Sequence, residues 1–150
     1  MSDVASRVSA AKLWLTAVGG GDAPYLSAAV YAMPTVVSEQ VETISADDSW
    51  RVYVNPQWAL NVDVPVLGAH FAHLVWHLLR DHAGRARSMG VGRRESTAWA
   101  NAADCTVAET LVAAGHGAVD LPSPTTLHLP EGLSVEEYFT VINRLSAGGG

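Results

Sequence analysis

Histidines are concentrated in one short stretch of this 150-residue chain. Four of the six fall within the thirteen residues from His70 to His82, and two of these, His73 and His77, stand four residues apart. On a helix this spacing places both imidazoles on one face, one turn apart, which is the geometry that a tetrahedral zinc needs from its first two ligands. The stretch therefore predicts a metal site.

Leu74 follows the first of these two histidines. In the H-E-x-x-H zinc helix of hydrolases this position is a glutamate, which takes a proton from the zinc-bound water. Leucine has no proton acceptor, and loss of general-base catalysis typically lowers a rate by about 10²- to 10⁴-fold. Two explanations stay open: Leu74 is an inactivating change, natural or engineered, or another carboxylate such as Glu109 or Asp104 has taken the role of the base.

A catalytic zinc also requires a third protein ligand and an open coordination position. Asp81 lies about 12 Å from His73 along a straight helix, which is too far to share one ion. His82 is about 140° round the helix from His77 and reaches the metal only if the helix bends or stops after His77. Gly84 makes such an early stop feasible.

A carboxylate from the following helix is the other source of a third ligand. Asp104 and Glu109 could arrive from across the fold, either as a ligand or as a group that orients an imidazole. A simpler alternative also stays open, in which the histidines form a stabilising metal site or a hydrogen-bonded cluster and Leu74 only packs against the apolar face of its helix.

Hydrophobic periodicity predicts the elements that position these residues. Helices are expected over residues 4–18, 24–33, 65–82 and 97–114, and a last one runs from the capping box at 134–137 to about residue 145. Strands are expected over 35–44 and 50–54, joined by a turn at 46–49 into an antiparallel hairpin, whereas 83–95 is expected to be a glycine- and arginine-rich loop. The sequence thus predicts an α+β fold, mostly helical, with a small antiparallel hairpin packed against the metal-site helix.

Length and composition predict one domain over residues 1–145 and a glycine-rich tail or linker over 146–150. The net charge of -6 argues against a nucleic-acid surface, which needs a basic stripe. No apolar run approaches the roughly 20 residues of a membrane span. The single cysteine, Cys105, permits no internal disulfide, and the N-terminus is too polar for a signal peptide, so we expect a cytoplasmic protein.

Four segments in order add a more specific pattern, and they read WRVYVNPQW, HLVWHLLRDHAGRAR, WANAADCTVAETL and LPEGLSVEEYFTVI. From about Pro24 to Ile142 the chain resembles the metallopeptidase domain that precedes a von Willebrand A-like domain in many bacterial proteins. That family shows a strand ending in Asn-Pro, an H-E-x-x-H-x-x-x-x-H helix, a basic stretch and a Trp-Asn-x-Ala-x-Asp helix.

The resemblance implies a zincin-like fold with zinc as the cofactor. It places His73, His77 and His82 on the family's three histidines, Asp104 on its aspartate, and Leu74 where the family has its glutamate. It also implies that the edge strand of the hairpin aligns an extended peptide. We therefore expect a zinc-metallopeptidase-like domain that is inactive as written and retains metal and peptide or protein binding, with no nucleic-acid or membrane partner. The alternative is a non-enzymatic protein-interaction domain without a catalytic metal.

Overall fold

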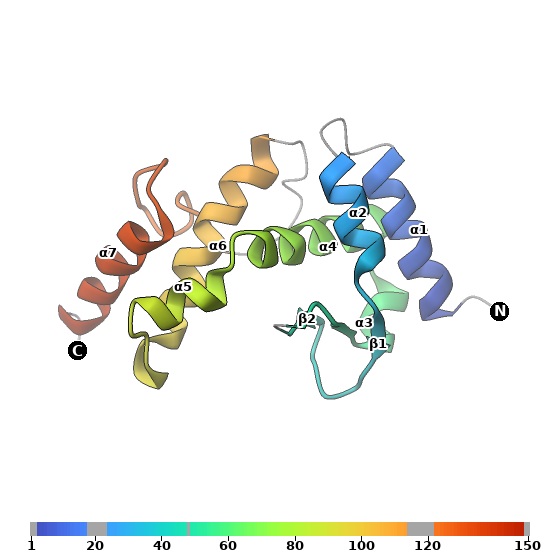
Figure 1. The fold of residues 1–150 in the computed structure, drawn as a ribbon, viewed down its shortest axis with the longest axis horizontal. Helices are drawn as coiled ribbons and strands as arrows, with labels where there is room; N and C mark the ends of the chain where they lie inside the picture. Colours follow the sequence, from blue (N-terminus) through green and yellow to red (C-terminus); the bar gives the residue numbers. More distant parts are fainter. Residues whose placement is uncertain (1–2, 18–23, 48, 114–121, 149–150) are drawn as a thin grey trace.

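Helices dominate the structure, and one small sheet packs beside them (Figure 1). The computed structural model describes residues 3–17, 24–47, 49–113 and 122–148. In chain order the elements are α1 (Val4–Ala17), α2 (Pro24–Ala32), β1 (Thr35–Val37), β2 (Ile44–Ala46), β3 (Val52–Val54), α3 (Pro56–Asn61), α4 (Val64–Leu79), α5 (His82–Ser88), the 3-10 helix η1 (Arg93–Glu95), α6 (Ser96–Ala113) and α7 (Val135–Gly148). The predicted α+β class, mostly helical, is confirmed.

The five predicted helices correspond to α1, α2, α4, α6 and α7. The capping box before α7 forms as expected, because the Ser134 amide donates to the Glu137 carboxylate (3.0 Å) and the Glu137 amide donates to the Ser134 hydroxyl (3.1 Å). Helix α7 then continues to Gly148, past its expected end near residue 145. The glycines at 19–21 and 115, which are expected to end two of the helices, lie outside the described residues.

The short helix α3 is absent from the sequence prediction, although its start signal is present. The Asn55 side-chain oxygen accepts hydrogen bonds from the amides of Gln57 and Trp58, both at 3.0 Å, and Pro56 occupies the first helical turn. An asparagine cap followed by proline is a favoured helix start. The Asn-Pro pair therefore ends a strand and begins a helix at once.

The prediction of a loop over 83–95 is wrong, because α5 and η1 occupy most of that segment. Its glycines suggested a chain without regular structure. Gly84 instead lies in the first turn of α5, where the Asp81 carboxylate accepts a hydrogen bond from its amide (3.2 Å). A Cβ at this position would overlap that carboxylate, so the glycine serves the helix start instead of breaking it.

The sheet has three strands in the order β1-β3-β2. Strands β2 and β3 form an antiparallel hairpin, as expected, but its first strand is Ile44–Ala46 and not the predicted 35–44. Only Thr35–Val37 of the remaining predicted strand is extended, and it pairs with β3 in parallel. Asn55 explains the difference: its amide donates to the Thr43 carbonyl (2.7 Å) and its side chain donates to the Val41 carbonyl (2.9 Å). These bonds hold the loop between β1 and β2 against the end of β3. The chain therefore passes from β1 on one side of β3 to β2 on the other side.

Two apolar clusters form the core. The first cluster joins α1, the sheet, α4 and the end of α6, and the second joins the start of α6 to α7. Gly68 lets α1 and α4 approach closely, since a Cβ there would lie 2.6 Å from the Trp14 ring. Figure 1 shows α4 between α1 and α2 on one side and α5 and α6 on the other. Among the described helices, none is both long and apolar enough to cross a membrane.

Candidate metal centre

Helix α4 presents the two predicted zinc-ligand histidines beside its apolar face. Leu67, Phe71 and Val75 on that face are fully buried in the first cluster. His73 and His77 form the adjoining stripe, as expected from their spacing, with His73 buried and His77 partly buried. The packing of the apolar stripe therefore fixes the direction in which both imidazoles point.

A sharp break separates α4 from α5. The C-cap of α4 is Arg80, and Asp81 then takes a left-handed conformation with φ of 50°. Aspartate is one of the few residues other than glycine that adopt this region readily. His82 follows as the first residue of α5. From its spacing, His82 can approach the site only if the helix stops early, and α4 does stop before it.

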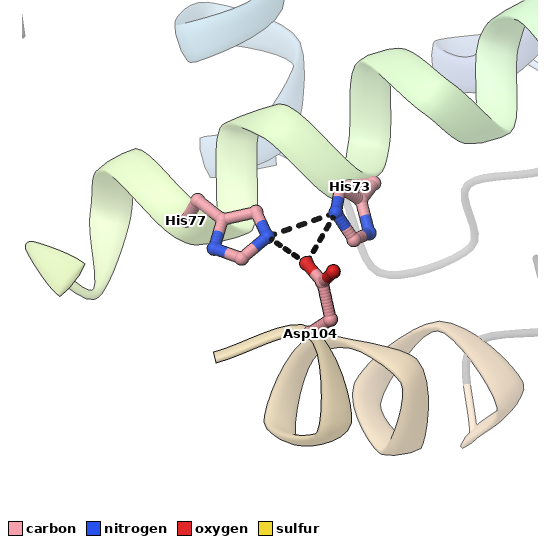
Figure 2. A group of neighbouring side chains, drawn as sticks. All are labelled: His73, His77 and Asp104. Carbon is pink, nitrogen blue, oxygen red and sulfur yellow. Dashed lines mark hydrogen bonds and ion pairs between the residues drawn. The ribbon is translucent and has the colours of Figure 1, made fainter. Parts of the chain in front are cut away.

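Asp104 completes a compact group with the two histidines, as Figure 2 shows. It lies on α6, and its Oδ1 is 2.9 Å from Nε2 of His77 and 3.1 Å from Nε2 of His73. The two Nε2 atoms are 2.8 Å apart. Three potential ligand atoms from two helices therefore converge on one point, and they all lie within 4.8 Å of one another. Of the three roles expected for Asp104, namely base, ligand and orienting group, this position fits that of a ligand.

His82 lies on the other side of the His77 ring. Its Nδ1 is 2.8 Å from Nδ1 of His77, whereas Asp104 approaches Nε2 of His77. The structure thus brings three of the four expected residues to one point and places His82 behind His77. His82 is only 5% exposed, and its Nε2 is buried without a hydrogen-bond partner in the described chain.

The charges of the group suit a cation. Burial raises the pKa of Asp104, but hydrogen bonds from His73 and His77 outweigh burial and hold the pKa at about 2. Burial lowers the pKa of His77, and the hydrogen bond to Asp104 only partly offsets this. The pKa of His82 falls to about 4, first through burial and then through the proximity of His77. At neutral pH the carboxylate is therefore ionised, and His77 and His82 keep neutral rings with a free lone pair.

The donor set fits zinc in type and in scale. Two imidazoles and one carboxylate are a known three-ligand set for catalytic zinc, which leaves a fourth position open. Ligand atoms around a tetrahedral zinc lie about 3.3 Å apart. The three distances here, 2.8, 2.9 and 3.1 Å, need to open by only a few tenths of an ångström, which small side-chain rotations provide.

A cavity of about 490 Å³ opens beside the group. Strand β2, helix α4 and the starts of α5 and α6 line it, and Leu74 forms part of the wall. Of the described residues that line this cavity, Asp81 and Asp104 carry carboxylates. Glu109 is not among them, because its carboxylate accepts hydrogen bonds from the Tyr138 hydroxyl and the Gly132 amide elsewhere. The structure therefore places Glu109 away from the position of the missing base.

Trp50 also lines the cavity, and no motif in the sequence marks it as a site residue. It lies in the turn between β2 and β3 with φ of 65°, a conformation that is strained for a bulky side chain. Asp47 fixes the turn: its carbonyl accepts from the Trp50 amide (3.1 Å), and its carboxylate accepts from the amides of Ser49 and Arg51 and from the Tyr53 hydroxyl. The turn signal at 46–49 was visible in the sequence, but the left-handed tryptophan had no sequence signal.

His70 lines the same cavity without joining the group of three. Its ring packs edge-on against Trp58, with centroids 5.0 Å apart. Burial, and to a lesser degree the proximity of His73, lowers the pKa of His70 to about 4. The fourth histidine of the cluster is therefore a neutral, packed side chain in the cavity wall. His128, which is distant from the cluster in sequence, is exposed in its loop.

Comparisons with known proteins agree with this geometry at the level of the family. No curated protein and no solved structure matches the chain. The family described as "Putative metallopeptidase domain" matches residues 6–150, which is nearly the whole sequence. The match includes both helices that supply the converging ligand atoms, and the chain belongs to this family of metallopeptidase-type domains.

Proposed function

We propose that this chain is a zinc-metallopeptidase-like domain of zincin-like fold that binds the metal and a peptide or protein ligand but lacks peptidase activity as written. The observation that carries the proposal is the convergence of His73 Nε2, His77 Nε2 and Asp104 Oδ1 at the edge of a cavity. The family supports a metal and a hydrolytic ancestry. Two imidazoles and a carboxylate favour zinc over magnesium or calcium, which prefer all-oxygen sites.

The chain's own residues would bind the metal and leave one face of it open toward the cavity. Zinc in such a site supplies a Lewis acid that polarises a carbonyl and acidifies water. Leu74 lines the cavity at the position that follows the first ligand, and its side chain can neither accept a proton nor orient a water. We therefore infer that the domain binds a peptide without cleaving it at the rate of a complete enzyme.

An extended peptide is the ligand class that the cavity favours. Strand β2 is at the edge of the described sheet, so one row of its backbone groups is not used in the ladder, and its residues line the cavity. A free strand edge can pair with an extended chain. We also propose a cytoplasmic location, on the basis of the single Cys105, and a downstream von Willebrand A-like domain in the complete protein, on the basis of the resemblance. Nucleic acid and membranes are not among the proposed partners.

Metal analysis tests the proposal directly. Protein purified without chelators should contain about one equivalent of zinc, because three ligands of the correct type converge. A His73→Ala, His77→Ala double variant should lose it. The matched control is His128→Asn, which removes an exposed histidine outside the cavity and should leave the zinc content unchanged. Equal zinc in the double variant, or none in the folded wild type, would overturn the proposal and favour an interaction domain without metal.

A further inference from the structure

The two ring nitrogens of His77 have different neighbours. Nε2 faces His73 and Asp104, and Nδ1 faces Nδ1 of His82 at 2.8 Å. The rings of His77 and His82 lie 5.0 Å apart between centroids, with 73° between their planes. His82 is 5% exposed, so little water can compete for its contact with His77.

The proton count on this pair decides what His82 can do. Two ring nitrogens at hydrogen-bond distance share a single proton, so one donates and the other accepts. A neutral imidazole carries one N–H, and a metal ligand must present a bare nitrogen to the ion. If Nε2 of His77 binds the metal, the proton of His77 lies on Nδ1. His77 then donates to Nδ1 of His82, which must be the acceptor.

We propose that His82 is a positioning residue, which fixes the ring and tautomer of His77 so that Nε2 of His77 is free for the metal, and is not a third imidazole ligand. The inference rests on the proposed function, because it presumes that His77 binds zinc. It departs from the pattern of the sequence, in which His82 was the expected third ligand. The position of Asp104 supports this assignment, since the Asp104 carboxylate already lies at the third ligand position beside His73 and His77.

The surroundings of His82 hold it in this role. Its carbonyl accepts a hydrogen bond from the indole N–H of Trp99 (3.1 Å), and the Trp99 ring packs on Phe139 in the second cluster. On the other side, the left-handed turn at Asp81 fixes the start of α5. These contacts hold the backbone of His82 at the start of α5, so its ring is presented beside His77.

The unpartnered Nε2 of His82 is consistent with the same assignment. When Nδ1 accepts from His77, the single proton of His82 must lie on Nε2, which is buried without a partner in the described chain. A buried N–H without a partner is uncommon in native proteins, so this one calls for an explanation.

Two substitutions of His82 distinguish its role as a hydrogen-bond acceptor from a role in filling space. In His82→Asn the amide oxygen stands near the position of Nδ1 and can accept from His77, whereas His82→Leu fills the space without an acceptor. We expect the leucine variant to bind zinc 10- to 100-fold more weakly, the range typical of groups that orient a metal-bound histidine. The asparagine variant should stay within a few-fold of the wild type. Zinc affinity is measured by competition with a chelator.

Two spectroscopic measurements on the zinc-loaded wild type keep the test independent of how the variants fold. X-ray absorption should show two imidazoles on the zinc, and the same number in both variants. Long-range ¹H–¹⁵N NMR of histidine-labelled protein should show His77 protonated on Nδ1 and His82 protonated on Nε2.

The contrary outcomes are distinct. Three imidazoles in the wild type that fall to two in both variants would make His82 a ligand, overturning this inference and leaving the proposed function intact. Equal losses of affinity in the asparagine and leucine variants, or no loss in a folded leucine variant, would also overturn the positioning role. A folded wild type that binds no zinc would overturn the proposed function and this inference together.

Discussion

Leu74 is half-buried, with one side against the first cluster and the other on the cavity. Leu74→Glu should confer zinc-dependent peptide cleavage, because the new carboxylate would face the open side of the metal and accept a proton there. The charge should also cost roughly 1–3 kcal/mol of stability if it stays unpaired at this half-buried position. Incubation with a mixed peptide library, followed by mass spectrometry of the products, measures the gain.

Two controls make the Leu74→Glu result specific. Leu74→Gln has nearly the same shape as the glutamate variant but no basic carboxylate, so it should stay inactive. His77→Ala in the glutamate background should abolish cleavage together with zinc binding. Cleavage by the leucine form at the rate of the glutamate form would show that position 74 is not the site of the missing base.

Trp50 offers a test of stored backbone strain. The residue keeps φ of 65° within a turn fixed by Asp47. Trp50→Ala and Trp50→Gly lose the same ring packing, but only glycine adopts this region without steric cost. The glycine variant should therefore be about 1 kcal/mol more stable than the alanine variant in urea denaturation. The opposite order would mean that the turn relaxes once the ring is removed.

At the scale of single residues, spacing and residue type predict much of the group. His73 and His77 follow from helical periodicity, and Asp104 was a candidate because it lies on the next predicted helix. The position of His82 could not be predicted, since it depends on the dihedral angles of Asp81, which residue type only biases. The place of Trp50 in the cavity wall could not be predicted for the same reason, because no sequence pattern marks a bulky residue with positive φ.

The break between α4 and α5 depends on one hydrogen-bonded turn. Gly84→Ala should push the Asp81 carboxylate from its place at the start of α5, at a cost of about 1 kcal/mol for the lost cap and more for the overlap. It should also weaken zinc binding, because His82 opens the same helix. Thermal unfolding and the zinc competition assay measure both effects.

Gly92→Ala is the matched control for the Gly84 substitution. A Cβ at Gly92 would meet the Glu95 carboxylate at 3.6 Å, which is ordinary contact, and the backbone there has no left-handed conformation. This variant should keep its stability within about 0.5 kcal/mol and its zinc affinity unchanged. If both variants lost the same stability and zinc affinity, the cause would be a general disturbance of the helices and not the displacement of the Asp81 carboxylate.

At the scale of elements, the sequence predicts long helices well and the sheet only partly. The apolar stripes of α4 and α7 repeat over several turns, so their existence was clear. Strand pairing was not, because alternation shows which face of a strand is buried but not which strand lies beside it. The parallel pairing of β1 depends on hydrogen bonds from Asn55 to the loop before β2, a contact without a periodic signature.

The pH dependence of stability belongs to the whole molecule. Folding lowers the pKa values of His70 and His82 from 6.5 to about 4. Between pH 6.5 and 4 these two histidines are protonated in the unfolded chain but neutral in the folded chain. The free energy of unfolding should therefore fall as the pH drops through this range. His82 alone contributes at most about 3–4 kcal/mol at about 1.4 kcal/mol per pKa unit. Asp104, with its pKa lowered to about 2, should extend the loss below pH 3.8.

Urea denaturation of the metal-free protein at a series of pH values between 7.5 and 4 measures this loss. His70→Phe should lower the proton uptake on unfolding by up to one proton, because the neutral ring at position 70 no longer distinguishes the folded from the unfolded chain. A stability that stays constant from pH 7.5 to 4.5 would contradict the assignment of neutral buried histidines.

The metal group lies where the two apolar clusters meet, and this placement has a mechanical consequence. Its histidines belong to α4, which packs in the first cluster, and Asp104 lies on the part of α6 that packs in the second. A zinc ion there would act as a cross-link between residues 27 positions apart in the chain. A covalent link that closes a loop of this size contributes about 3 kcal/mol by restricting the unfolded chain. The metal ligands would thus hold the two clusters together. This stabilising role needs no general base, so the leucine at position 74 does not impair it.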